Sequence, residues 1–260
     1  MYDLSLSNST HQFSHMVLLR CFLFICVCGL FGCNPTVKSS TYHVAAIERL
    51  LANFEHIAFV DEYDNERQYS HIRKWVDPIQ IVLLGEQSNN YRSAIENYSN
   101  SLSLLTGLSI NVLLESKHPY NFEIHFVLWD EIEKLAKPHS PNPEWLETII
   151  EDSSCLFIFK RNKKYEIKQA FIYISIEEPV DEIKSCLLEE MTQALGFPND
   201  SELIKPSIFN QWDHLQELSI NDKILIQTLY DNRLKPGLSR EAGLEQARII
   251  INELSFQILH

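Results

Sequence analysis

The sequence predicts one α+β domain behind an N-terminal export segment, and three observations support this prediction. The chain has 260 residues, 45% of them hydrophobic, which is enough for one sizeable core. Apolar residues follow helical spacing in some segments and alternate in others, in the order helix, strand, helix, several strands, then helices. A short apolar stretch near the start ends at a cysteine, and a polar segment follows it.

The first half of the domain combines two helices with three strands. Apolar residues at helical spacing predict helices over residues 43–58 and 91–105. Alternating or continuous apolar runs predict strands over residues 75–84, 110–114 and 122–128. Together these segments predict a helical layer against a sheet.

The second half begins with a proline-rich loop over residues 138–143 and finishes in helices. Between them we expect a hairpin of two strands that turns at Lys163-Lys164, and a helix with Asp181 as its N-cap and Gly196 as its C-cap. The predicted bounds are strands over residues 155–160 and 167–176, then helices over residues 181–195, 222–230 and 240–259.

Residues 1–33 are predicted to be a cleaved signal peptide. From Met16, which we take as a candidate for the true start, one positive charge at Arg20 precedes an apolar run over residues 21–31. This run is too brief to span a bilayer comfortably, and a small residue precedes Cys33, as at a cleavage site. An uncleaved membrane anchor and an ordinary signal peptide are the alternatives.

The segment Leu30-Phe31-Gly32-Cys33 resembles the bacterial lipobox, with a bulkier residue at Phe31 than is usual there. The resemblance implies that Cys33 carries the lipid and becomes the first residue, with residues 34–42 as a tether and residues 43–260 as the domain. Asn34 after the lipidated cysteine favours the outer membrane, facing the periplasm. We therefore expect a lipid-anchored protein of the cell envelope.

The cysteines and the charge narrow the classes of protein further. Of six cysteines, only Cys155 and Cys186 lie beyond the export segment and Cys33, so one disulfide is predicted; two buried free thiols are the alternative. The formal net charge of −13 lies entirely beyond residues 1–33, which hold one Asp and one Arg. Because nucleic-acid binding needs concentrated Lys and Arg, we expect no nucleic-acid partner.

One helical segment carries a zinc-protease pattern without its metal ligands. Zinc proteases of the HExxHxxGxxH type place two histidines one helical turn apart, with a glutamate between them and a third ligand after a glycine. Here the glutamate is Glu190 and the glycine is Gly196, but the three ligand positions hold Glu189, Gln193 and Asn199. The chain contains no HExxH.

Two later segments extend the pattern in the right order. Residues 207–210 read Ser-Ile-Phe-Asn, with Phe209 at the methionine position of a Ser-Ile-Met turn, and Leu218-Ser219 leads to Asp222 and Tyr230. With the helical segment, they resemble the metzincin zinc metalloproteases. The resemblance implies a zincin-like fold: a mixed sheet, an active-site-type helix and C-terminal helices.

The same residues resemble more closely a family of Gram-negative lipoproteins that carry a domain of unknown function. Its signatures match residues 189–200, 207–210 and 229–237, and the resemblance covers about residues 43–245. It implies an exported domain with a zincin-like fold and no established activity.

The ligand positions do not suit zinc, because the amides of Gln193 and Asn199 are poor zinc ligands. We expect no metal and no cofactor. The remaining donors are one carboxylate, one amide and Asn199 or Asp200. They could instead hold a hard cation, form a buried hydrogen-bonded network, or border a cleft in which an edge strand pairs with a peptide. For Glu189 and Glu190 alone, a solvated helix face is the simpler interpretation.

We favour a pseudoprotease that binds a peptide or an envelope protein. The competing hypothesis is a hydrolase that uses Glu190 as general base without His-ligated zinc. Of the ten histidines, His11 and His15 fall outside the mature domain, and the others supply no pair at ligand spacing. His125 is expected on a sheet face, and His214 could approach the cleft.

Overall fold

The computed structural model describes residues 44–60, 69–115, 118–140, 146 and 154–259. The signal segment, Cys33 and the tether lie outside the described residues, so the predictions for them stay predictions. By its contacts, the chain from Tyr42 to His260 forms one compact unit. No helix among the described residues is both long enough and apolar enough to cross a membrane.

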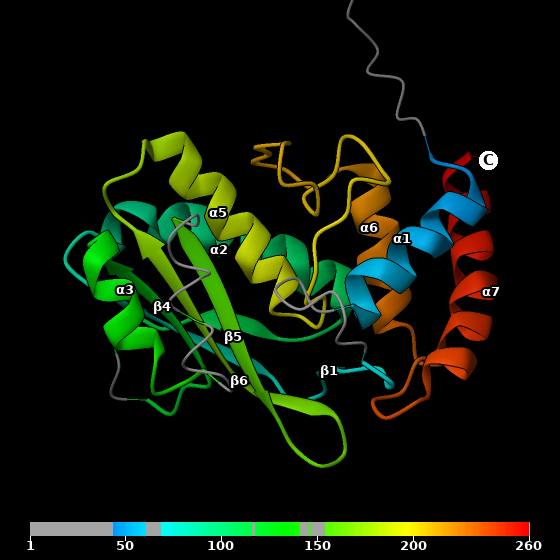
Figure 1. Ribbon diagram of the computed structural model, residues 1–260, viewed down its shortest axis with the longest axis horizontal. Helices are drawn as coiled ribbons and strands as arrows, with labels where there is room; N and C mark the ends of the chain where they lie inside the picture. Colours follow the sequence, from blue (N-terminus) through cyan, green and yellow to red (C-terminus); the bar gives the residue numbers. More distant parts are fainter. Residues whose placement is uncertain (1–43, 61–68, 116–117, 141–145, 147–153, 260) are drawn as a thin grey trace, which may run out of the picture. The chain divides into compact units, whose positions relative to one another are not determined.

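The strands form a mixed sheet in which β5 alone, among the described strands, runs antiparallel to its neighbour (Figure 1). The strand order is β1-β6-β4-β2-β3, and β5 pairs with β6 as the predicted hairpin. The bounds are β1 Lys74–Trp75, β2 Ile79–Leu84, β3 Ile110–Val112, β4 Phe122–Val127, β5 Cys155–Arg161 and β6 Glu166–Ser175.

Helices cover both faces of this sheet. Alternate residues of β5 and β6 point to opposite faces, so Phe157 and Ile172 join the main core under α2 and α5, whereas Leu156 and Tyr173 join a smaller cluster under α3. Helices α1 and α7 lie side by side at one end of the domain (Figure 1). The bounds are α1 Ile47–Phe59, α2 Ser88–Thr106, α3 Trp129–Ala136, α5 Val180–Gln193, α6 Ile220–Tyr230 and α7 Arg240–Leu259.

The predicted combination of helices with a mixed sheet is confirmed, but several predicted bounds are wrong. The strand expected over residues 75–84 is two strands, because Pro78 interrupts it and has no N–H for a ladder. Helix α1 begins at Ile47 rather than at residue 43. Helix α3 was not predicted; it is short, and only Ile132 and Ala136 are buried along it.

Both predicted caps of α5 are also wrong. The N-cap is Pro179, and Asp181 lies in the first turn, where its charge favours the helix end. The C-cap is Ala194 rather than Gly196. Gly196 follows at φ +130°, and a Cβ there would lie 2.3 Å from the carbonyl oxygen of Arg73. Glycine is therefore required by a close approach of two backbones after the helix.

Residues 73–75, which Gly196 approaches, contact the C-terminal ends of three helices. Arg73, Lys74 and Trp75 each donate a side-chain hydrogen bond to a carbonyl at the C-terminal end of a different helix. The acceptors are Ala58 O in α1 for Arg73 (2.7 Å), Leu229 O in α6 for Lys74 (2.9 Å), and Ala194 O at the end of α5 for Trp75 Nε1 (2.9 Å). Carbonyls at helix ends lack partners within the helix, so this segment satisfies three of them.

The predicted disulfide is confirmed. Cys155 at the start of β5 is bonded to Cys186 in α5, and 31 residues separate them. Because the bridge closes a long loop, it also fixes the edge strand against the helix.

The close approach at Gly196 predicts an unequal pair of glycine substitutions. Gly196→Ala would force a Cβ against Arg73 O, so we expect it to lower the free energy of unfolding by roughly 3 kcal/mol. Gly107→Ala, at the C-cap of α2, is the control: φ is +72° and no atom lies within 4 Å of the added Cβ. We expect it to cost about 1 kcal/mol. If urea unfolding shows that the two variants lose the same free energy of unfolding, this account of Gly196 is wrong.

Candidate functional site

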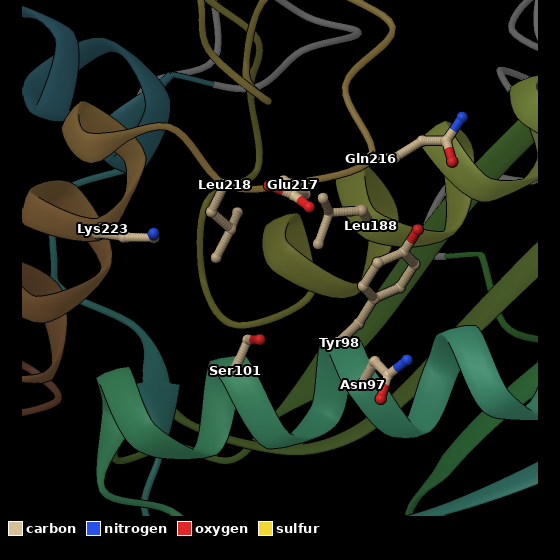
Figure 2. Close-up of a pocket in the computed structure, with 8 residues that line it drawn as sticks. All are labelled: Asn97, Tyr98, Ser101, Leu188, Gln216, Glu217, Leu218 and Lys223. Carbon is tan, nitrogen blue, oxygen red and sulfur yellow. The ribbon is translucent and has the colours of Figure 1, made fainter. Parts of the chain in front are cut away.

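Helix α5 presents two different faces. One carries Leu188, which lines a pocket of about 300 Å³ together with α2 and the segment that leads into α6 (Figure 2). The other carries polar residues three or four positions apart, which therefore lie along one side of the helix. These are Glu182, Cys186, Glu189, Glu190 and Gln193. Because Cys186 is bonded to Cys155, this polar face is turned toward β5.

The carboxyl groups of Glu189 and Asp200, which we call the carboxyl pair, converge with the amide of Gln193 at the C-terminal end of the polar face. Gln193 Nε2 donates to Asp200 Oδ1 at 2.5 Å. Burial and the neighbouring charge of Asp200 raise the pKa of Glu189 to about 8. Burial raises the pKa of Asp200 to about 7, although the hydrogen bond from Gln193 opposes this shift. The pair therefore retains protons near neutral pH, as two close carboxyl groups in a poorly solvated site do.

The other predicted site residues lie apart from this carboxyl pair. Asn199 is buried, and its Nδ2 donates to His56 O in the last turn of α1 at 3.5 Å, so it ties the segment after α5 to that helix. Glu190 is 4% exposed and lies about 100° around the helix from Glu189. The structure thus joins Glu189 and Gln193 to Asp200 instead of to Asn199. Helical spacing left the choice between Asn199 and Asp200 open, because both residues follow the helix on a loop.

The predicted tight turn at residues 207–210 is present, and Asp222 holds it. Asn210 N donates to Ser207 O at 3.1 Å, which closes the turn. The fully buried carboxylate of Asp222 accepts hydrogen bonds from Ser207 Oγ (2.6 Å), Ile208 N (3.2 Å) and Ser219 N (2.8 Å). These bonds join the turn to the start of α6.

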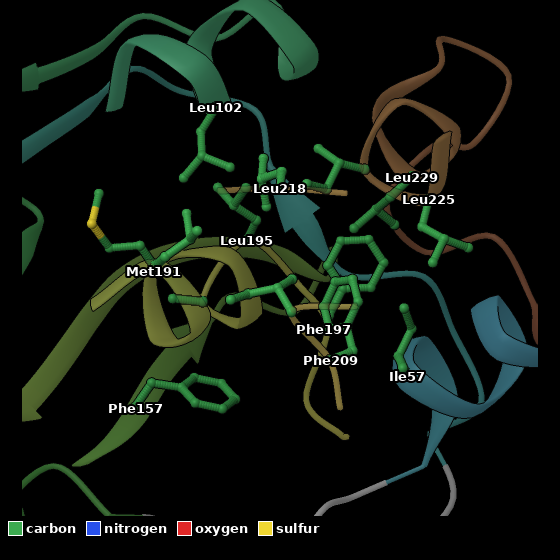
Figure 3. Close-up of a cluster of buried hydrophobic side chains, with 14 of the residues drawn as sticks. Ile57, Leu102, Phe157, Met191, Leu195, Phe197, Phe209, Leu218, Leu225 and Leu229 are labelled. Atoms are coloured by element: carbon green, nitrogen blue, oxygen red, sulfur yellow. The ribbon is translucent and has the colours of Figure 1, made fainter. Parts of the chain in front are cut away.

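Aromatic rings pack the turn into the core. Phe209 is fully buried, and its ring meets that of Phe197 edge to face at 5.0 Å. Figure 3 shows both rings beside Leu225 and Leu229 of α6. Ser201 N also donates to Phe209 O at 2.6 Å, so the segment that carries Asp200 is fastened to the turn. The segment that carries Asp200 is therefore held by the buried turn.

The two histidines singled out in the sequence, His125 and His214, contact other carboxylates than Glu189 and Asp200. His125 is on a sheet face, as predicted, where it stacks on Tyr173 and contacts Glu123. His214 Nδ1 lies 2.6 Å from Glu182 Oε2, which brings the segment after the turn to the N-terminal part of the same polar face.

The donors of the carboxyl pair do not fit zinc. Zinc sites are built from imidazole and thiolate groups with few carboxylates, whereas this cluster offers two carboxyls and an amide. Within the residues that the structure describes, no group of three or more His, Cys, Asp or Glu side chains could hold a metal ion.

A comparison with known families identifies the domain. The family model described as a protein of unknown function (DUF2927) matches residues 48–250, which extend from α1 into α7 and include the whole carboxyl pair. A search of the curated proteins finds no match. The expected resemblance to a family with a domain of unknown function is therefore confirmed.

The raised pKa values predict how stability depends on pH. In the unfolded chain the two groups titrate near 4.5 and 3.8, so between about pH 4 and pH 8 the folded state binds more protons. The stability that the pair contributes is thus complete at low pH and is lost as pH rises through the folded pKa values, by up to about 1.4 kcal/mol per pH unit for each proton. We expect Asp200→Asn to flatten this loss in urea unfolding between pH 5 and pH 8.

The matched control is Asp181→Asn, at an exposed position in the first turn of α5. It should leave the pH dependence of the wild-type protein in place. If the stability of Asp200→Asn falls with pH as steeply as that of the wild-type protein, the pair does not hold protons.

Proposed function

The chain belongs to the family of unknown function DUF2927, and we propose that its domain is a zincin-like, non-catalytic module that binds an extended peptide segment of a partner in the cell envelope. One observation carries the proposal: the polar face of α5, with its carboxyl pair, is bonded to the antiparallel edge strand β5 through Cys155–Cys186.

Three features support a zincin-like arrangement. The sheet is parallel except for one antiparallel edge strand, and α5 directly follows β6. A tight turn at residues 207–210 comes after the helix, and Asp222 at the start of the next helix anchors it. These features have the order of the metzincin resemblance, although the ligand positions carry Glu189, Gln193 and Asn199.

The edge strand suits peptide pairing. Among the described strands, β5 pairs only with β6, so its second edge has no strand partner there. Extended peptides bind such edges by adding a strand, with affinity from backbone hydrogen bonds and selectivity from the side chains that they meet. Glu189 of α5 and Asp200, on the loop after this helix, would then select the side chains of the peptide that point toward them.

An exported, lipid-anchored location suits the same role. A disulfide persists in an oxidising compartment, and Cys155–Cys186 is such a bond. We propose that Cys33 carries the lipid and that the nine residues 34–42 tether the domain, with a reach of up to about 30 Å from the outer membrane into the periplasm.

The second candidate is a hydrolase that uses Glu190 as general base. Glu190 is nearly buried and is next in sequence to Glu189, whose pKa is raised. Enzymes tune acids and bases in such poorly solvated settings. This alternative and the binding role differ in what happens to the bound peptide.

The test uses an unstructured decapeptide library. Peptides that the full chain retains are expected to slow amide hydrogen exchange in residues 155–161, because added backbone hydrogen bonds protect the edge strand. Each retained peptide should stay intact on long incubation. Protection confined to other segments would exclude the edge-strand role.

Glu190→Gln separates the two candidates. The binding role predicts that this variant retains the same peptides with affinity within about threefold, because the amide preserves the volume of the side chain. The hydrolase predicts that the wild-type protein cleaves a retained peptide and that the variant does not.

A further inference from the structure

The pocket beside α2 is separate from the carboxyl pair (Figure 2). Leu188 contributes to its lining and lies on a different face of α5 from Glu189 and Gln193. Its volume of about 300 Å³ is at the lower end of the range for small-molecule sites, roughly 300–1,000 Å³. It is large enough for a molecule of about two amino-acid residues, but not for a folded partner.

Two oppositely charged side chains line this pocket and do not pair with each other. Lys223 of α6 and Glu217, which precedes the helix, both line it, and Figure 2 shows the two side chains directed toward the same space. Within the described part of the chain neither forms an ion pair. A pocket lined by one cation and one anion is complementary to a molecule that carries both charges.

The remaining polar groups divide into two ends. Ser101 of α2 lies at the end of the pocket that Lys223 faces, whereas Asn97, Tyr98 and Gln216 gather at the other end (Figure 2). In the residues that the structure covers, none of these four side chains makes a hydrogen bond. Burial and the charge of Glu217 raise the pKa of Tyr98, so its hydroxyl stays protonated and can donate.

We propose that this pocket binds a free amino acid or dipeptide as a zwitterion. The carboxylate lies against Lys223 and Ser101, and the ammonium group lies against Glu217. A polar side chain of the ligand extends to the amides of Asn97 and Gln216, while two leucines contact its apolar atoms. The site lies outside the polar face of α5, so it does not depend on the proposed peptide-binding function.

The test is isothermal titration calorimetry of the full chain with L-glutamine and glycyl-L-glutamine. At least one of them is expected to bind, and N-acetylation or C-terminal amidation of that ligand should each weaken binding about tenfold or more, because each removes one charged contact. If neither free compound binds, or if both blocked forms bind equally well, the proposal is wrong.

Two variants assign each charge to its partner. Lys223→Met should abolish the preference for the carboxylate over the amide, and Glu217→Gln should abolish the preference for the free amine over its acetylated form. Lys163→Met and Glu86→Gln replace exposed residues away from the pocket and should keep both preferences. If both pocket variants keep the ligand preferences of the wild-type protein, the assignment is wrong. It is also wrong if the two control variants lose binding as the pocket variants do.

Discussion

The ends of three helices meet at one short segment, and the rest of the domain depends on that meeting. Arg73, Lys74 and Trp75 satisfy carbonyls of α1, α6 and α5 in turn, and Gly196 lets the chain after α5 come into contact with them. Burial and Lys235 lower the pKa of Lys74 to about 8. A cation is favourable at a helix C-terminus, so the domain tolerates this buried amine where it completes two helix-end contacts.

The same contacts position the candidate site. Trp75 and Tyr230 hold the last two carbonyls of the turn after α5, which fixes the rotation of the helix and thus the side of it on which Glu189 and Gln193 lie. Asp222 separately fixes the turn that supports Asp200. This frame keeps Glu189 and Asp200 close together, although burial and the neighbouring charge of Asp200 raise the pKa of Glu189.

Much of this fold could be predicted because its signals are local. The apolar patterns of the sequence predicted α2, α5, α6 and α7 and the strands β5 and β6, and the cysteine count predicted Cys155–Cys186. The failures involve tertiary structure. Two of the three helix-end contacts, those of Lys74 and Trp75, join residues more than 100 positions apart. Asp200 enters the carboxyl pair only because Gly196 turns the chain back, and no periodicity encodes that path.

The central claim is that Glu189 and Asp200 form a carboxyl pair that keeps its protons near neutral pH, and that this site holds no zinc. Elemental analysis of the full chain, purified without chelators, tests this most directly. We expect zinc far below one atom per chain, with no change in Glu189→Gln or Asp200→Asn, because the pair of carboxyls and the amide of Gln193 are an unsuitable donor set. One tightly held zinc per chain that either substitution removes would contradict the claim.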